Sequence, residues 1–174
     1  MSPEALSKPE IPQESAERGN AEKRGIKRAA IEELRGPLES LIRQLGDQIE
    51  SGAYTIIIGD DASGRIPTLI FDKVIKAIYQ EKGYPSPATI FLAGKYPENL
   101  SLESNEGVRS YKRNRAAAYI KHTLKETGRD ETRARALIVT DTIGTGKSLR
   151  PITDAVKLNG LDFDIASVAL FASD

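Results

Sequence analysis

Four short apolar runs, rich in β-branched residues, constrain the fold of this chain more than any other feature of its sequence. Each run has the length and composition of a buried strand. We predict these strands at residues 53–58, 88–92, 136–139 and 165–171. Between them lie stretches with the apolar spacing of amphipathic helices. We predict these helices at residues 67–82, 115–127 and 148–158.

The alternation of strands with helices indicates the fold class. A strand, a helix and the next strand form a right-handed βαβ unit, in which the two strands are parallel. We therefore predict an α/β protein with a doubly wound parallel sheet. An apolar period over residues 31–49 predicts N-terminal helices packed on this core, with Pro37 in the first turn of the second one.

The N-terminal segment differs in composition from the rest of the chain. Residues 1–25 are polar, rich in Pro, Glu and Ser, and carry no apolar period. Such a segment buries too little apolar surface to fold, so we predict a disordered tail. Residues 26–174 are then expected to form one α/β domain, which suits a chain of 174 residues.

The composition argues against several classes of function. The chain has no cysteine, which excludes disulfides, thiolate metal ligands and a cysteine nucleophile. Its single histidine, His122, argues against a histidine-based triad or a multi-histidine metal site. No run reaches the ~20 apolar residues of a membrane span, and the N-terminus lacks the apolar region of a signal peptide. We therefore expect a cytoplasmic protein with no membrane partner.

The net charge of the chain indicates whether a nucleic acid is an expected partner. The chain has 25 basic and 25 acidic residues, so its formal net charge is zero. A nucleic-acid-binding domain is usually basic, so no nucleic-acid partner is expected for the domain as a whole. A net charge of zero is still compatible with a local basic patch on one surface.

Two glycine-containing loops follow predicted strands, at residues 59–65 and 140–148. Doubly wound sheets bind their ligands at the carboxyl ends of the strands, where the strand order reverses. Both loops lie at such ends. We therefore expect them to face one ligand-binding crevice.

The second loop resembles part of a nucleotide-binding P-loop. Gly146, Lys147 and Ser148 supply the second half of the G-x-x-x-x-G-K-[ST] pattern. Asp141, however, occupies the place of the first glycine, where its carboxylate would lie against the phosphates. The last predicted strand also ends without a clear Walker-B aspartate. A P-loop-like NTPase is therefore disfavoured.

The same loop suits a sugar phosphate. The backbone amides of a Gly/Thr turn at a helix N-terminus form an anion-binding nest, and Thr145 and Ser148 add hydroxyl donors. Asp141 precedes this nest by about one sugar's length, and a carboxylate there can accept hydrogen bonds from vicinal ribose hydroxyls. An acid, a spacer and then an anion-binding nest is the order that favours a 5-phosphoribosyl group as the ligand.

Residues 137–149, LIVTDTIGTGKSL, resemble the signature that binds phosphoribosyl diphosphate (PRPP) in the type I phosphoribosyltransferases. The resemblance extends in element order over residues 53–171. It implies that Asp141 and Thr140 lie at the reacting ribose. It also implies a 5′-phosphate loop made by Gly144, Thr145, Gly146, Lys147 and Ser148.

The first loop resembles the diphosphate-binding loop of the same family. The residues implied in diphosphate binding are Asp61, Ala62, Ser63, Gly64 and Arg65, together with Lys95 after the second strand. Mg²⁺ would be held chiefly by PRPP itself, with Asp60 as a candidate protein contact, since magnesium keeps many substrate and water ligands. Residues 97–113, with Arg109, Lys112 and Arg113, correspond to the loop that closes over PRPP in the family.

Several positions depart from the family pattern. Thr140 stands where the family has the first of two acids, so a charge that would stabilise a cationic transition state is missing. Gly144 replaces the aspartate that serves the base in 6-oxopurine enzymes. The chain also stops three residues after Phe171, where family members complete a hood over the base.

Because of these departures, the sequence is compatible with two functions. The leading prediction is transfer of 5-phosphoribose from PRPP to a small nitrogen acceptor such as a nucleobase, with release of pyrophosphate. The alternative is a regulatory module of the same fold that senses PRPP or a nucleotide without catalysis. The acceptor, and whether the chain forms a homodimer, stay open.

Overall fold

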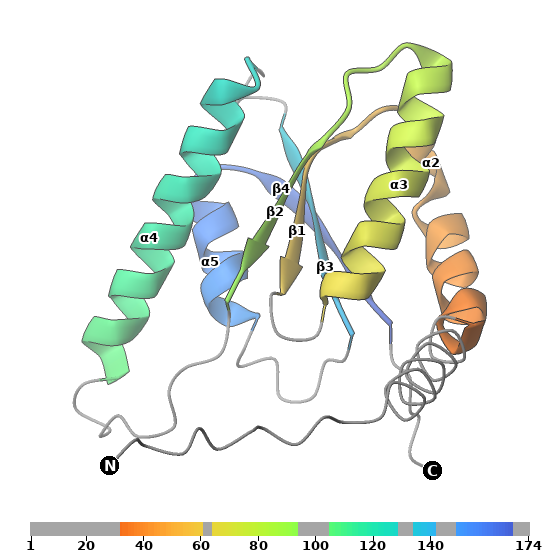
Figure 1. Ribbon diagram of the computed structural model, residues 1–174. Coiled ribbons are helices and arrows are strands. Elements are labelled where there is room, and N and C mark those ends of the chain that lie inside the picture. The colour runs from red at the N-terminus through yellow and green to blue at the C-terminus, as the bar shows by residue number, and fades with distance from the viewer. Residues whose placement is uncertain (1–31, 61–63, 94–104, 129–133, 142–148, 169–174) are drawn as a thin grey trace, which may run out of the picture.

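The computed structural model describes residues 32–60, 64–93, 105–128, 134–141 and 149–168. Within these ranges the chain forms one parallel sheet with helices on both faces (Figure 1). The strands are β1 (Tyr54–Asp60), β2 (Ala88–Leu92), β3 (Arg135–Thr140) and β4 (Asp162–Ser167). The predicted α/β class with a doubly wound parallel sheet is confirmed at this level.

The helices connect the strands in the expected alternation. A helix over residues 32–44, called here the 32–44 helix, comes first. It is followed by α2 (Gly46–Glu50), α3 (Arg65–Lys82), α4 (Asn105–Glu126) and α5 (Arg150–Leu158). The predicted helices and strands are thus present in order, with ends that differ by a few residues. The exceptions are α4 and the N-terminal helices. The predicted helix start at Pro37 was wrong, because the 32–44 helix runs through Pro37, at the loss of one backbone hydrogen bond, and the break before α2 falls at Leu45.

Helix α4 begins ten residues earlier than the sequence predicts. The resemblance implied a loop over residues 97–113, but residues 105–113 belong to the helix. The prediction was wrong because this part has no apolar period, the signal that marks a helix in a sequence. Lysine and arginine are good helix formers, and extending a helix already packed through Ile120 and Leu124 needs no new nucleus. Arg109, Lys112 and Arg113 therefore lie on a helix.

The strand order is β2-β1-β3-β4, with every pair parallel. The chain moves from β1 to β2 in one direction and then crosses back to β3 on the other side of β1. This reversal places α3 on one face of the sheet and α4 and α5 on the other (Figure 1). The switch point of the sheet therefore lies between β1 and β3.

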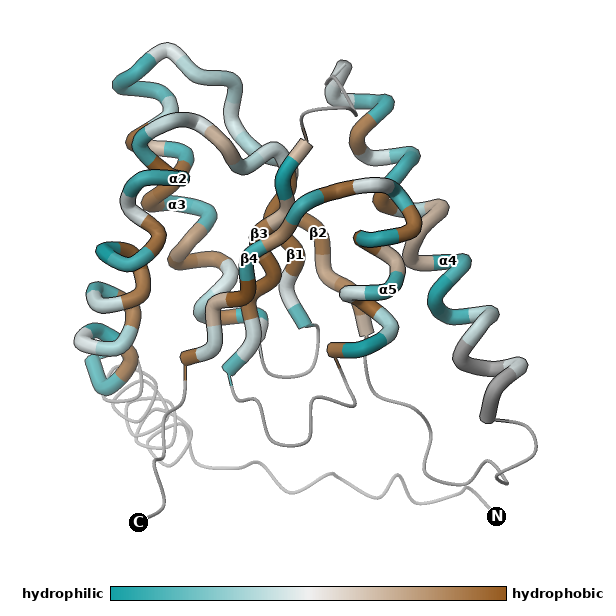
Figure 2. Tube along the Cα trace, turned by 180° about the vertical axis from the view of Figure 1, so that it is seen from behind, coloured by the Kyte–Doolittle hydropathy of each residue, from teal (hydrophilic) through white to brown (hydrophobic). Residues whose placement is uncertain are grey.

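The core consists of one apolar layer on each face of the sheet. Successive residues of a strand point to opposite faces, so Ile56 and Ile58 pack under α4 and α5, whereas Ile57 packs under α2 and α3. The 32–44 helix adds Leu34 and Leu38 to this second layer. Figure 2 shows hydrophobic residues along the central strands and interspersed along the helices that cover them. Burial on both faces explains why β1 and β3 are continuous apolar runs.

Candidate functional site

The carboxyl ends of β1 and β3 lie side by side at the switch point. Gly59 is in register with Val139, so the next residues, Asp60 and Thr140, end neighbouring strands. Both continue the alternation of the strands on the face covered by α4 and α5. Helices α3 and α5 begin at this same edge of the sheet, and the N-terminal end of α4 extends past it (Figure 1). The two predicted loops therefore leave the sheet next to each other.

Gly64 brings the first loop against the end of β3. A Cβ atom on Gly64 would lie 2.6 Å from the carbonyl oxygen of Val139 and 3.0 Å from the backbone nitrogen and oxygen of Asp60. The Gly64 amide donates to the Asp60 carbonyl at 2.8 Å, and Thr68 donates to the Gly64 carbonyl through both its amide and its hydroxyl. A side chain at position 64 would collide with backbone that cannot move aside. The glycine is required because of this close approach.

Asp60 and Thr140 are both buried. Asp60 is 2% exposed and Thr140 is fully buried. The Thr140 carbonyl accepts a hydrogen bond of 3.0 Å from the Val168 amide. The hydroxyl that we expected near the ribose therefore lies within the protein in this structure.

Asp141 follows β3 directly and is half-buried. The next described residue after it is Leu149. The position of Asp141, one residue beyond buried Thr140, places it at the open edge of the sheet. Of the two residues expected at the reacting ribose, Asp141 is the one with solvent access.

Arg65 opens α3 beside this edge and is exposed. Its guanidinium carbon lies 5.1 Å from the centre of the Phe91 ring, within the range of a cation–π contact. Phe91 in turn packs where Gly59 leaves room, since a Cβ atom on Gly59 would lie 2.7 Å from the ring. A cation is thus held near the ends of β1 and β2.

The remaining predicted site residues lie outside the described ranges. They are Asp61, Ala62, Ser63, Lys95, Gly144, Thr145, Gly146, Lys147 and Ser148. Helix α5 begins just after them, and its N-cap residue Leu149 makes no side-chain capping bond. Within the described ranges no group of three or more metal-ligating side chains forms, and no described helix is long and apolar enough to cross a membrane.

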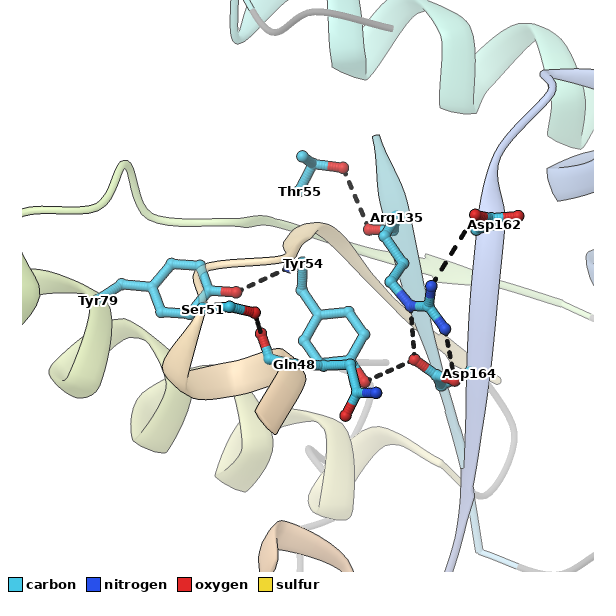
Figure 3. Close-up of polar contacts among 8 residues, drawn as sticks. All are labelled: Gln48, Ser51, Tyr54, Thr55, Tyr79, Arg135, Asp162 and Asp164. Carbon is cyan, nitrogen blue, oxygen red and sulfur yellow. Dashed lines mark hydrogen bonds and ion pairs between the residues drawn. The ribbon is translucent and has the colours of Figure 1, made fainter. Parts of the chain in front are cut away.

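A second polar cluster, which the sequence did not reveal, lies at the amino edge of the sheet, where the strands begin. Figure 3 shows its side chains. Arg135 on β3 donates to both carboxylate oxygens of Asp164 on β4, at 2.8 and 3.0 Å. The Tyr54 hydroxyl on β1 donates to the same carboxylate at 2.8 Å. The backbone amide of Tyr54 donates to the hydroxyl of Tyr79 at 2.8 Å. One cluster therefore links three neighbouring strands and α3.

A β-bulge makes this cluster possible. Tyr54 pairs with Arg135, and Ile56 pairs with the next residue, Ala136, so Thr55 is an extra residue on β1. The Thr55 hydroxyl donates to the Arg135 carbonyl at 3.1 Å. The bulge turns Tyr54 toward the face that carries Arg135 and Asp164. Sequence periodicity carries no signal for a single inserted residue.

The contacts within the cluster shift the pKa values of Asp164 and Tyr54. Hydrogen bonding to Arg135, with a smaller contribution from Tyr54, holds the pKa of Asp164 below its ordinary value, although burial opposes this. Burial, reinforced by the hydrogen bond to Asp164, raises the pKa of Tyr54 well above its ordinary value. Asp164 is thus ionised and Tyr54 protonated at neutral pH. Because its charges are paired within the sheet, we interpret the cluster as structural.

Comparison of the chain with models of protein families, with curated proteins and with solved structures gave no match.

Proposed function

We propose that this chain is a PRPP-binding domain of phosphoribosyltransferase type, with its site at the carboxyl ends of β1 and β3. The main support is the approach of Gly64 to the end of β3, where a Cβ atom would lie 2.6 Å from the Val139 carbonyl. This contact joins the end of the diphosphate-like loop, where α3 begins, to the strand that carries the PRPP-like motif. The two motifs are about 80 residues apart in the sequence, yet their described ends adjoin at the switch point, where such sheets bind ligands.

Each residue in the proposal has a distinct role. The Asp141 carboxylate accepts hydrogen bonds from the ribose hydroxyls. Residues 144–148 bind the 5′-phosphate at the start of α5, and residues 61–65 bind the diphosphate. Mg²⁺ would be held chiefly by oxygens of PRPP and water, with Asp60 as a candidate protein contact, and would neutralise negative charge on the diphosphate. Asp60 is buried, which suits a contact through water or backbone better than direct ligation.

The proposed reaction is a transfer at the anomeric carbon of ribose. The bond from that carbon to the diphosphate oxygen breaks, a bond to a nitrogen of the acceptor forms, and pyrophosphate leaves with the bonding electrons. The proton of the attacking nitrogen passes to solvent or to the leaving group. Positive charge that develops on the ribose would be stabilised by Asp141.

One observation favours the alternative, a module that binds PRPP or a nucleotide without catalysis. The resemblance places an acid at position 140, but the chain has a threonine there and the structure buries it completely. The site then lacks one of the two charges expected beside the ribose. Binding through Asp141 and the phosphate loop would persist, whereas transfer would be slow.

Thermal unfolding with added ligands tests the proposal. At about 100 times its dissociation constant, PRPP with Mg²⁺ should stabilise the fold by ~2.7 kcal/mol, a rise in melting temperature of roughly 5–10 °C. Asp141→Asn should abolish most of this rise. Asp162→Asn, the same change at the opposite edge of the sheet, should retain it. ATP with Mg²⁺ should give a smaller rise than PRPP.

Absence of a PRPP-dependent rise, or an equal rise in Asp141→Asn, would refute this site. If PRPP binds, pyrophosphate release across a panel of nucleobases distinguishes the two candidates. Release with one base identifies a transferase. Binding without release with any base supports the sensing module.

A further inference from the structure

The two helical layers of the protein differ in charge, although the chain is neutral as a whole. The layer formed by α4 and α5 has two acidic residues among its described side chains, Glu126 and Asp154. Its basic residues are Lys112, Arg113, Arg115, Lys121, Lys125, Arg150 and Lys157. This is the local basic patch that the overall charge balance left open.

The opposite layer balances its charges. Acidic and basic side chains occur there in nearly equal number, and many pair within the layer. Arg35 lies 3.1 Å from Glu39, and Lys76 lies 2.8 Å from Asp72. Lys82 pairs with Glu50. The positive charge of the α4 layer therefore has no counterpart on the other side of the sheet.

Helix α4 presents this charge on a long exposed surface. Ile120 and Leu124 anchor its inner side in the core, and the side chain of Asn159, the C-cap residue of α5, donates to the Ala117 carbonyl at 3.0 Å. Much of the helix is hydrophilic (Figure 2). We call the side away from the sheet the α4 outer face and define it by Tyr111, Arg115, Tyr119, His122 and Lys125. The exposed Glu126 also lies on this side, 3.2 Å from His122, and is the one acidic side chain there among the described residues. Lys112 and Lys121 flank this face.

Aromatic side chains are interleaved with the basic ones on the α4 outer face. Tyr111 is 63% exposed and Tyr119 is 48% exposed. Arg115 lies between them at four-residue spacing, so the three side chains follow one ridge of the helix at intervals of ~6 Å. Aromatic rings on a basic surface stack on bases, while the cations contact phosphates.

We propose that the α4 outer face binds single-stranded nucleic acid. The cations supply affinity for the phosphates, and Tyr111, Arg115 and Tyr119 offer three planar groups on which bases can stack. Two features argue against a membrane surface. The face has no large aliphatic side chain, and its aromatic residues are tyrosines, whereas membrane-binding helices bury an apolar side of Trp, Phe or Leu.

This surface is distinct from the proposed PRPP site. The described side chains of the face run from Tyr111 to Lys125, a length of ~21 Å along the helix. They point away from the sheet, whereas Asp141 and Gly64 lie at its carboxyl edge. Neither proposal requires the other.

Fluorescence anisotropy of the full chain with labelled oligouridine and oligothymidine, each of about 12 nucleotides, tests the proposal. Binding should be detected at low salt and should weaken as salt rises. Tyr111→Ala combined with Tyr119→Ala should reduce affinity at least about tenfold at constant charge, since stacking contributes strongly at each base. Alanine favours a helix, and both tyrosines are exposed, so this variant should fold.

The contribution of charge is tested separately. The combined variant Arg115→Gln, Lys121→Gln and Lys125→Gln should make the negative slope of log affinity against log salt shallower by about 2, at ~0.7 for each phosphate contact. Arg43→Gln, on the 32–44 helix of the opposite layer, is the matched control and should change nothing. Circular dichroism of each variant verifies the fold.

Three outcomes would overturn the proposal. The first is absence of oligonucleotide binding at low salt. The second is binding that the tyrosine variant leaves unchanged, because that would be attraction of a polyanion without stacking. The third is equal affinity for heparin and for oligonucleotides. Heparin has no bases, so equal affinity would also show attraction of a polyanion without stacking.

Discussion

At the scale of single residues, Gly64 links the fold to the proposed site. Its backbone dihedrals, φ −77° and ψ −2°, are open to any residue, so the requirement for glycine is purely one of space. The atoms around it are backbone atoms of Val139 and Asp60, which belong to two neighbouring strands. A larger residue would therefore push the loop away from the sheet.

Gly64→Ala should lower the free energy of unfolding by about 1–3 kcal/mol, because the added methyl group meets backbone atoms that cannot move aside. Urea unfolding measures the change. The matched control is Gly107→Ala in α4, where a Cβ atom would have no neighbour within 4 Å among the described atoms. That variant should be neutral or more stable by up to ~1 kcal/mol. Equal effects of the two substitutions would contradict this account of Gly64.

At the scale of elements, the strands are joined by two different kinds of contact at their two ends. At the carboxyl edge, where the proposed ligand would bind, the backbone of Gly64 packs closely against the ends of β1 and β3. Side-chain pairing dominates at the amino edge, where Arg135, Asp164 and Tyr54 connect β3, β4 and β1. The paired charges stabilise the sheet at the edge away from the proposed site.

Acid should weaken the amino-edge cluster. The folded pKa of Asp164 lies below its unfolded value, which is ~3.9 for an ordinary aspartate. The stability contributed by its ionised form is therefore complete above pH ~4 and is lost as pH falls through the lowered folded pKa. Asp164→Asn should cost about 2 kcal/mol at neutral pH, since it loses hydrogen bonds to a charged group.

The difference in unfolding free energy between the wild type and Asp164→Asn should shrink as the pH is lowered below ~4. Asp162→Asn provides the control, since its carboxylate is exposed and lies 3.9 Å from Arg135, where an ion pair contributes at most ~1 kcal/mol. A difference for Asp164→Asn that stays constant from pH 7 to pH 3 would show that its charge does not stabilise the fold.

At the scale of the whole molecule, the described core includes the 32–44 helix. Leu34 and Leu38 are each 4% exposed and pack with β1, α3 and the end of β4 in one apolar cluster. The predicted boundary at residue 26 keeps this helix within the domain. Residues 1–25 lie outside the described ranges.

We expect that deleting residues 1–25 leaves the free energy of unfolding unchanged within ~0.5 kcal/mol, because that segment has no apolar period. Leu38→Ala in the full chain should lower it by ~2–4 kcal/mol, because it leaves a cavity beneath the helix. Urea unfolding measures both. A large loss on deleting residues 1–25 would place the domain boundary nearer to residue 1.

The elements of the fold could be predicted where a local pattern marked them. The apolar run at residues 53–58 predicts a strand, and the periodic stripe over residues 67–82 predicts a helix, because periodicity reflects which faces become buried. Residues 105–113 carry no such stripe, and their helical state depends on continuation from the packed part of α4. The pairing of Arg135 with Asp164, 29 residues later, depends on which strands lie side by side.

The sequence by itself determined the α/β class, the positions of the strands and the two glycine-containing loops, because strand and helix periods are local properties of the chain. The tertiary structure alone decided that Asp60 and Thr140 are buried, that Gly64 lies against β3 and that positive charge gathers on α4. These features arise from the strand order β2-β1-β3-β4 and from which helix covers which face. They depend on contacts between residues far apart in the chain, which no local pattern encodes.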